Sequence, residues 1–318
     1  ACLGIVKKEN IIYGNALNVG SQLIYVGSKT GNEGINGALM SSKQFKDMDF
    51  DELKKNIQVG DPFLERLLLE ACNEMSSKNI VEGMQDMGAG GVLCASVEVI
   101  KRGIEKTGNL FGCNIDVDKI PVKYEMDDCD KLISESQERM LIVARPENTS
   151  KIFEIFKKWD LEYSVIGYVT DTNNYSVYKN NIKIFEQGID DFSAPDQQWN
   201  TSKLHNEYEK YMGIDRDTKI KNTKYWEEYD NTIGCRTIKG PLEPGHYSIL
   251  DIYEINKKLA VTWGSTFDIC HSKMLVLGTN PLGVINCMNF GHPEDSMGSF
   301  VKILEDFSNK CEHYGVPI

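Results

Sequence analysis

Asp86 is the most informative position for chemistry, because it stands directly before a glycine-rich run. Residues 85–91 read QDMGAGG and are followed by an apolar stretch typical of a helix. Backbone N–H groups at such a turn attract an anion, and a carboxylate beside them can hold a divalent cation. The alternative is that Asp86 only caps the helix and the glycines only form a tight turn. The motif alone does not decide between these interpretations.

Further polar groupings are weaker when each is taken alone. The glycines of residues 31–37 could cradle a phosphate, but they match neither the dinucleotide motif nor the P-loop. Glu135, Ser136 and Gln137 combine an acceptor, a hydroxyl and an amide, which suits a polar ligand but also a solvated helix end. Gln58 is uninformative without context. Residues 289–294 indicate either a ligand-binding strand end or a turn made by Gly and Pro.

Several other kinds of site are disfavoured by the sequence. Five histidines lie after residue 200, none at metal-ligand spacing, and no G-x-S-x-G motif offers a nucleophilic serine. Nine cysteines include no C-x-x-C pair, and their odd number is typical of a reduced, intracellular protein. The net charge of −12 argues against nucleic-acid binding. No apolar stretch approaches the ~18 residues of a transmembrane helix.

The elements that would position these residues follow from periodicity and capping signals. Residues 22–26 predict a strand, and 62–75 predict a helix with Asp61 as N-cap and apolar side chains at helical spacing. Helices are also expected at 92–101, 127–137 and 152–159, and strands at 140–144, 164–169 and 175–178. This mixture without a strict βαβ rhythm predicts α+β layers.

A polar linker is expected at 191–206, between regions 1–190 and 207–318. Beyond it, the pattern predicts helices at 225–230 and 301–314 and strands at 247–253 and 259–263. The first residues have neither a signal-peptide shape nor an initiator Met, which suggested an internal fragment.

Five segments in order resemble the synthetase subunit of phosphoribosylformylglycinamidine synthases. They are residues 31–38 (GNEGINGA), 58–63 (QVGDPF), 85–91 (QDMGAGG), 134–140 (SESQERM) and 288–294 (MNFGHPE). The resemblance implies a layered α/β sandwich of the aminoimidazole ribonucleotide synthetase-like superfamily, built as tandem two-domain units. Residues 1–190 would then be the second domain of the first unit, and 207–318 an incomplete first domain of the second.

The resemblance also implies a function. The family is a cytoplasmic carbon–nitrogen ligase that uses ATP and Mg²⁺ to amidate formylglycinamide ribonucleotide in purine biosynthesis. The reaction passes through an iminophosphate, and a glutaminase subunit or domain supplies ammonia. Carried onto this chain, Asp86 would be a Mg²⁺ ligand, while Gln58, Glu135, Ser136 and Gln137 would bind the ribonucleotide.

Two departures from the family pattern matter. The family's catalytic His lies upstream of position 1, so we expect no catalytic residue in this chain and no activity of the chain alone. The usual Thr-Asp-x-Leu-Asn-Phe-Gly motif is altered here, and Asn286 occupies the nucleotide-contacting Asp position. The helix before it is expected to be shortened, between 268 and 276. We therefore expect weak ATP binding by residues 207–318. Two alternatives remain open: a related ATP-dependent phosphotransferase, and a non-catalytic scaffold with the same fold.

Overall fold

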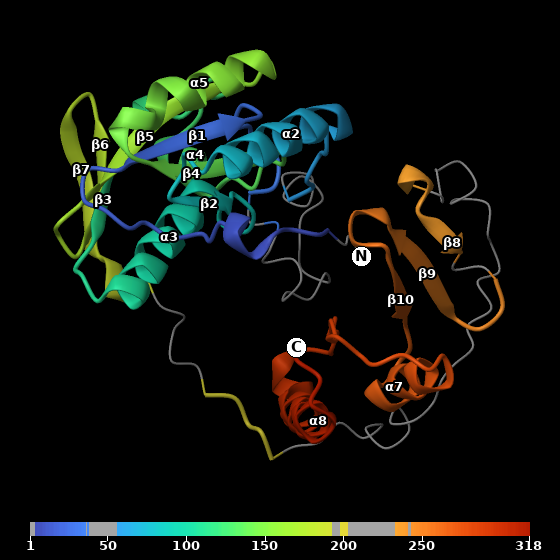
Figure 1. Ribbon diagram of the computed structural model, residues 1–318. Helices are drawn as coiled ribbons and strands as arrows, with labels where there is room; N and C mark the ends of the chain where they lie inside the picture. Colours follow the sequence, from blue (N-terminus) through green and yellow to red (C-terminus); the bar gives the residue numbers. More distant parts are fainter. Residues whose placement is uncertain (1–3, 36, 38–55, 193–197, 203–232, 241–242) are drawn as a thin grey trace. The chain divides into compact units, whose positions relative to one another are not determined.

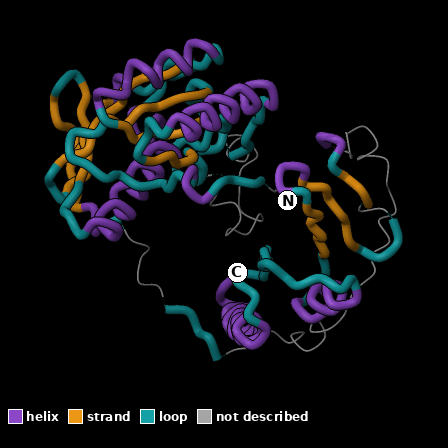
Figure 2. The backbone as a smooth tube through the Cα atoms, viewed as in Figure 1, coloured by secondary structure: helices purple, strands orange, loops and turns teal. Residues whose placement is uncertain are grey.

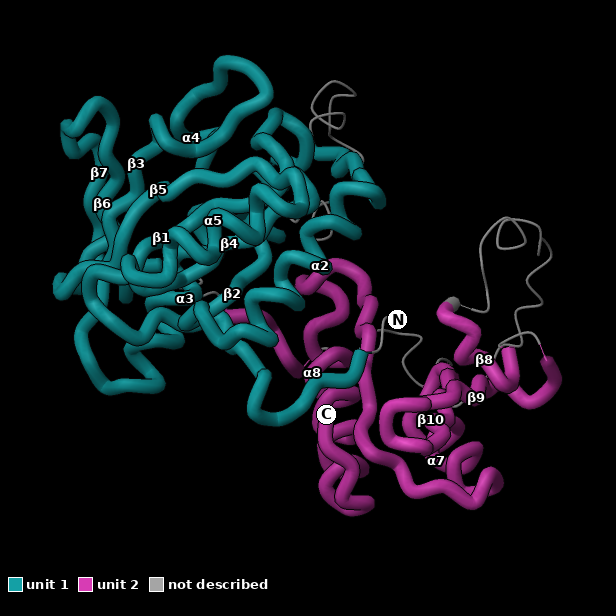
Figure 3. Tube along the Cα trace, turned by 45° about the horizontal axis from the view of Figure 1, so that its top comes forward, with its two compact units in different colours: residues 1–196 teal, residues 197–318 magenta. Residues whose placement is uncertain are grey.

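The computed structural model describes residues 4–35, 37, 56–192, 198–202, 233–240 and 243–318. The chain divides into two compact units, residues 1–196 and 197–318, which Figure 3 draws in two colours. This division falls within the stretch 191–206. The helix expected at 225–230 lies outside the described residues.

The first unit is built on a seven-stranded sheet with the order β2-β4-β1-β5-β3-β6-β7. Neighbouring strands are antiparallel except β3 and β6, which run parallel. Its strands are β1 (Gln22–Gly27), β2 (Gly83–Asp86), β3 (Gly112–Asp116), β4 (Arg139–Ala144), β5 (Tyr163–Thr170), β6 (Asn174–Lys179) and β7 (Ile182–Gly188). β1 lies inside the sheet, between β4 and β5, and is buried over most of its length.

Helices cover both faces of this sheet (Figures 1 and 2). Leu23 and Tyr25 of β1 pack in one core with α3 (Gly91–Thr107), whereas Ile24 and Val26 pack in a second core with α2 (Pro62–Lys78) and α5 (Thr149–Lys158). Successive side chains of a strand point to opposite faces, so one strand feeds both cores. The expected α+β layered sandwich is therefore confirmed.

Local signals fixed α2 well. The Asp61 carboxylate accepts hydrogen bonds from the N–H groups of Phe63 and Leu64, both at 3.1 Å, and Pro62 occupies the first turn. The helix ends at Lys78, three residues beyond the predicted end, and the next residue, Asn79, has left-handed backbone angles. The predicted α3 is likewise present, although it runs from Gly91 to Thr107.

The helix predicted at 127–137 is wrong in its second half. α4 spans only Asp128–Ile133, and Ser134 already has extended backbone angles. The residues that follow form a buried polar loop, because the Ser134 hydroxyl bonds to the distant Gly31 and the Ser136 carbonyl bonds to the Arg139 side chain rather than to the helix. Tertiary contacts outweigh helix propensity here.

The second unit has a three-stranded antiparallel sheet with the order β10-β9-β8. Its elements are β8 (Thr237–Lys239), β9 (Tyr247–Ile252), β10 (Lys257–Thr262), α7 (Phe267–Val276) and α8 (Pro293–Tyr314). α8 begins eight residues before the predicted start, with Pro293 in its first turn. None of the helices that the structure describes is both long and apolar enough to cross a bilayer.

Candidate functional site

Asp86 lies at the end of β2, and α3 begins five residues later at Gly91. The turn and the helix expected after this carboxylate are thus present. Its side chain is exposed, and Gln85 Nε2 donates a hydrogen bond to Oδ1 at 2.9 Å. An exposed carboxylate beside a helix N-terminus suits the binding of a cation together with an anionic group.

Gly91 allows this turn to pack against the loop after α4. Its φ is +56°, and a Cβ at this position would lie 2.2 Å from the main-chain oxygen of Ser134. Real Cβ atoms do not approach an oxygen so closely, and a left-handed φ is also costly for other residues. A glycine is therefore required where the helix meets the loop.

The Glu135 carboxylate joins two of the predicted motifs. Its Oε1 accepts a hydrogen bond from Gly90 N at 3.2 Å, and its Oε2 accepts one from Gln58 Nε2 at 2.9 Å. Glu135 is only 3% exposed. A buried carboxylate is stabilised by such donors and by the positive end of a helix. Gln58, the glycine turn after Asp86 and Glu135 therefore belong to one site, although the sequence separates them widely.

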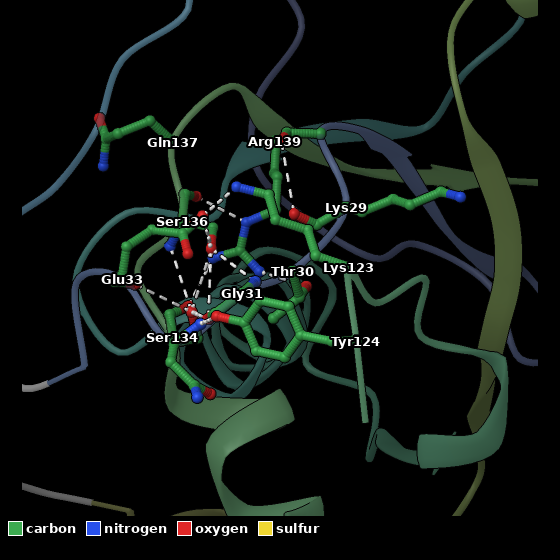
Figure 4. A network of polar contacts seen from close by, with 12 residues as sticks. Lys29, Thr30, Gly31, Glu33, Lys123, Tyr124, Ser134, Ser136, Gln137 and Arg139 are labelled. Carbon is green, nitrogen blue, oxygen red and sulfur yellow. Dashed lines mark hydrogen bonds and ion pairs between the residues drawn. The ribbon is translucent and has the colours of Figure 1, made fainter. Parts of the chain in front are cut away.

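Ser136 and Gln137 have different surroundings in this site. The buried Ser136 hydroxyl accepts from Gly31 N at 2.9 Å and donates to Glu33 Oε1 at 3.0 Å. It therefore holds the start of the glycine-rich stretch 31–37, whose sequence is only a weak match to a phosphate-binding loop. Gln137 donates to the main-chain oxygen of Glu135 at 2.9 Å, and its side chain points away from the cluster around Gly31 (Figure 4).

An ion pair closes the other side of the loop. Lys123 Nζ contacts Glu33 Oε1, and Tyr124 Oη accepts from Asn32 N at 2.7 Å. Burial raises the pKa of the Glu33 carboxyl, but Lys123, the Ser136 hydroxyl and a backbone N–H together outweigh it, so the net pKa is lowered. Glu33 is thus held as an anion.

Arg139 also belongs to this network, and the sequence analysis gave it no role. It lies at the start of β4 and is 3% exposed. Its guanidinium donates to main-chain and hydroxyl oxygens from three segments of the chain. The signal that could have revealed it is a lone cation entering an otherwise apolar strand, residues 140–144.

The residues around Asp86 fit a metal site in which water and substrate phosphates supply most of the ligands, rather than a site built from protein side chains alone. Within the described part of the chain, no group of three or more His, Cys, Asp or Glu side chains could hold a metal ion. Asp86 would thus contribute one carboxylate. Mg²⁺ commonly takes one or two protein carboxylates and completes its shell with water and substrate phosphates. An exposed Asp86 beside a helix N-terminus fits that arrangement.

Asn286 belongs to the second unit, where it lies on a cavity of about 900 Å³. The start of α7, residues 284–291 and one face of α8 line this cavity. Lys310 is a cation on its wall, but its Nζ contacts Asp268 Oδ2 at 2.7 Å and Asp306 Oδ2 at 2.9 Å. Two carboxylates therefore already neutralise the charge that a phosphate would need.

Comparison with known proteins gives consistent matches. The family described as AIR synthase related protein, C-terminal domain, matches residues 18–180. Over 99% of its length, the chain is 33% identical to the phosphoribosylformylglycinamidine synthase subunit PurL of Pelagibacter ubique, of which it covers 47%. It is 34% identical to the PurL of Nitratiruptor sp., again over 99% of its length and 47% of that protein.

Solved structures agree with these matches. A Thermotoga maritima PurL complexed with FGAR superposes with a TM-score of 0.79 at 28% identity, over 98% of this chain and 53% of that one. The same protein complexed with ADP gives 0.76 at 27% identity, over 98% and 51%. The chain thus spans about half the length of the relatives it matches. The matched range 18–180 includes Gln58, Asp86 and Glu135 but not Asn286.

Proposed function

The chain belongs to the AIR synthase related family, and on this premise we propose that it forms part of a phosphoribosylformylglycinamidine synthase. The proposed enzyme is a cytoplasmic carbon–nitrogen ligase of purine biosynthesis that converts formylglycinamide ribonucleotide to the formylglycinamidine ribonucleotide. The observation that carries this proposal is the meeting of Gln58 and Gly90 at the Glu135 carboxylate. A relative of similar fold is described as complexed with FGAR, which supports the choice of substrate.

The residues of this site have the chemistry to bind and orient a ribonucleotide. Glu135, as a carboxylate, only accepts hydrogen bonds, so it suits ribose hydroxyls or substrate N–H groups. Because the Gln58 amide nitrogen donates to Glu135, its oxygen is left as a second acceptor. Gln137 would add an amide that both donates and accepts. In this proposal these side chains fix the substrate amide for reaction.

Mg²⁺ and ATP fit the same region. When bound, they would supply the phosphoryl chemistry that activates the substrate amide oxygen as an iminophosphate; ammonia from a glutaminase subunit or domain would then form the new C–N bond and displace the phosphate. Asp86 would hold the cation, and the N-terminus of α3 would face the negative charge. Relatives of similar fold are described as complexed with ADP and with ATP, which supports ATP as the cofactor.

The second unit is proposed to bind a nucleotide weakly or not at all. Asn286 is a neutral amide where the resemblance expects a carboxylate, and amide oxygens are poorer ligands for a hard cation. The ion pairs of Lys310 with Asp268 and Asp306 add to this, since they leave a net negative charge on the cavity wall. This unit would then have a structural role.

Binding of the ribonucleotide tests the main proposal directly. Titration calorimetry on the full-length protein should show that Glu135→Gln weakens the binding of formylglycinamide ribonucleotide by about tenfold or more, since a hydrogen bond to a charged group is lost. Glu70→Gln, on the exposed face of α2, is the matched control and should bind like the unmodified protein. Equal affinities for both variants would rule out this site as the ribonucleotide site.

A further inference from the structure

Arg139 is a buried cation held by main-chain oxygens together with the hydroxyl groups of Thr30 and Tyr25. Its Nε donates to Ser136 O at 2.6 Å, and its Nη2 donates to Ser134 O and, at 3.5 Å, to Met87 O. Its Nη1 donates to Thr30 Oγ1 at 3.0 Å. Figure 4 shows the guanidinium pointing into the space between these segments. One planar group therefore contacts three separate parts of the chain.

Placing a full charge here is costly, and its cost has to be offset by these contacts. Burial lowers the pKa of the Arg139 guanidinium, while Tyr25, Glu33 and Glu135 act in the opposite direction. Arg nevertheless keeps its charge in proteins. Apolar residues of similar volume often replace buried charges without loss of stability. A cation at this position is thus better explained by the geometry that it imposes than by stability.

The guanidinium contacts both parts of the proposed site, the turn after Asp86 and the loop 134–137. Ser134 and Ser136, whose carbonyls receive the guanidinium, flank Glu135, and Met87 directly follows Asp86. The guanidinium fork is rigid, so the distance between its acceptors is fixed. It therefore ties the turn that carries the metal-binding candidate to the loop that carries the substrate-binding candidates.

The backbone next to Arg139 has a conformation that needs such support. Glu138 has a φ of +56°, which is unfavourable for a residue with a side chain. Its main-chain oxygen accepts from Ser28 N at 2.9 Å. The chain thus turns sharply between Gln137 and β4, and Arg139, directly after this turn, binds the carbonyls of Ser134 and Ser136 before it.

We infer that Arg139 is a positioning residue, which holds the Asp86 turn and the loop 134–137 as one unit for the proposed reaction. This inference rests on the proposed function of that site. Arg139 would not touch the substrate. It acts through Glu135 and Gln137, whose directions depend on the carbonyls that it binds. It would also couple substrate binding to the cation at Asp86.

Steady-state kinetics on the full-length enzyme provide the first test. Arg139→Lys keeps the charge but loses the fork, so we expect the KM for the ribonucleotide to rise about tenfold or more, on the scale of a small misplacement of binding groups. The Mg²⁺ concentration for half-maximal rate should rise as well, while the KM for ATP changes little. Arg66 forms an exposed ion pair with Glu70 on α2, so Arg66→Lys is the control and should change none of these values.

A general loss of stability has to be separated from a positioning role. Ile152→Val in the second core, on α5, is a destabilising control away from the site. It should lower the midpoint of thermal unfolding without raising the ribonucleotide KM. If Arg139→Lys does not fold, Thr30→Val removes a single acceptor of the guanidinium and should still raise the ribonucleotide KM, by about two- to fivefold.

A double-mutant cycle distinguishes this inference from the function on which it rests. If Arg139 acts through the loop, the two substitutions should not be independent. The fold-loss in ribonucleotide affinity of the double variant Arg139→Lys/Gln137→Ala should then be smaller than the product of the fold-losses of the two single variants. If Gln137→Ala raises the KM but Arg139→Lys and Thr30→Val do not, the positioning role is overturned while the proposed function stands. If neither Gln137→Ala nor Glu135→Gln changes it, the proposed function fails, and the inference fails with it.

Discussion

The main-chain N–H of Gly90 donates to the carboxylate of Glu135 across 3.2 Å, which joins the N-terminus of α3 to the loop after α4. A carboxylate placed there satisfies one of the helix's unpaired N–H groups and interacts favourably with its dipole. It also leaves the adjoining turn, with Asp86, on the exposed side of the same junction. The site therefore pairs a buried protein anion, Glu135, with an exposed carboxylate, Asp86, that solvent can reach.

Replacing Asp86 by Asn should reduce turnover by about 10² or more, because a key electrostatic group is lost at the developing charge. The fold should stay intact, since the Asp86 side chain is exposed. Rates measured across a Mg²⁺ titration check this expectation. Asp171→Asn, an exposed acid in the turn between β5 and β6, is the control. Near-normal activity of Asp86→Asn at every Mg²⁺ concentration would reduce Asp86 to a structural role.

Gln137→Ala should mainly raise the KM for the ribonucleotide and leave the KM for ATP close to its normal value. An amide that only positions the substrate contributes equally in the ground and transition states. Gln187→Ala on the edge strand β7 serves as the matched control. An ATP defect with normal ribonucleotide saturation would assign Gln137 to the nucleotide site instead.

Gly91→Ala and Gly108→Ala separate backbone strain from steric conflict, since both glycines have a positive φ. A Cβ at Gly108 meets nothing within 4 Å, so we expect a loss of about 1 kcal/mol in the free energy of unfolding. At Gly91 the Cβ also meets Ser134 O, and the loss should be larger by about 2 kcal/mol or more. Urea denaturation measures both. Equal losses would show that the helix and the loop can separate freely.

The ion pair of Glu33 and Lys123 predicts a pH-dependent contribution to stability. Because the folded pKa of Glu33 lies below the ordinary value of 4.5, this contribution is fully present above pH 4.5 and is lost as the pH falls through the folded pKa. Thermal midpoints of the protein and Glu33→Gln should therefore differ at neutral pH and converge in acid. Lys123→Met should reduce the difference at neutral pH. A difference in thermal midpoint that persists unchanged in acid would contradict this account.

Asn286→Asp tests the proposed decay of the nucleotide site in the second unit. Measured in the Asp86→Asn background, which weakens the first site, the protein with Asn286 should bind Mg²⁺–ADP weakly or not at all. Restoring the carboxylate should strengthen Mg²⁺-dependent binding, because carboxylates are better ligands for this cation. Calorimetry is the measurement. Micromolar or tighter Mg²⁺-dependent binding with Asn286 in place would show that the cavity is a working nucleotide site.

Sequence reasoning succeeded where local signals decide the structure. The Asp61 cap, Pro62 and the apolar stripe were sufficient to predict α2, a run of strand-favouring residues predicted β1, and alternation predicted β5 and β6. It failed for α4, whose expected continuation to 137 is prevented by bonds to segments more than a hundred residues away in sequence. β3 and β7 were not anticipated, since neither carries a clear pattern of its own.

The candidate site shows the same division. The resemblance grouped Gln58, Asp86 and Glu135, and the structure brings Gln58 and the turn after Asp86 to the Glu135 carboxylate. It could not show that the Ser136 hydroxyl faces the glycine-rich loop, since residue order carries no information on side-chain direction. Nor did it indicate Arg139, because its partners are carbonyl oxygens, which every residue possesses.

The position of β1 between β4 and β5 has a consequence for how the chain folds during synthesis. Gln22 pairs with Ala144 on one side and with Tyr168 on the other, so both neighbours of this strand are made long after it. At about 5–20 residues per second, the ribosome needs on the order of ten seconds to deliver them. During that time the apolar residues Leu23 to Val26 remain without their partner strands. The nascent first unit is thus a natural client for chaperones until β5 has emerged.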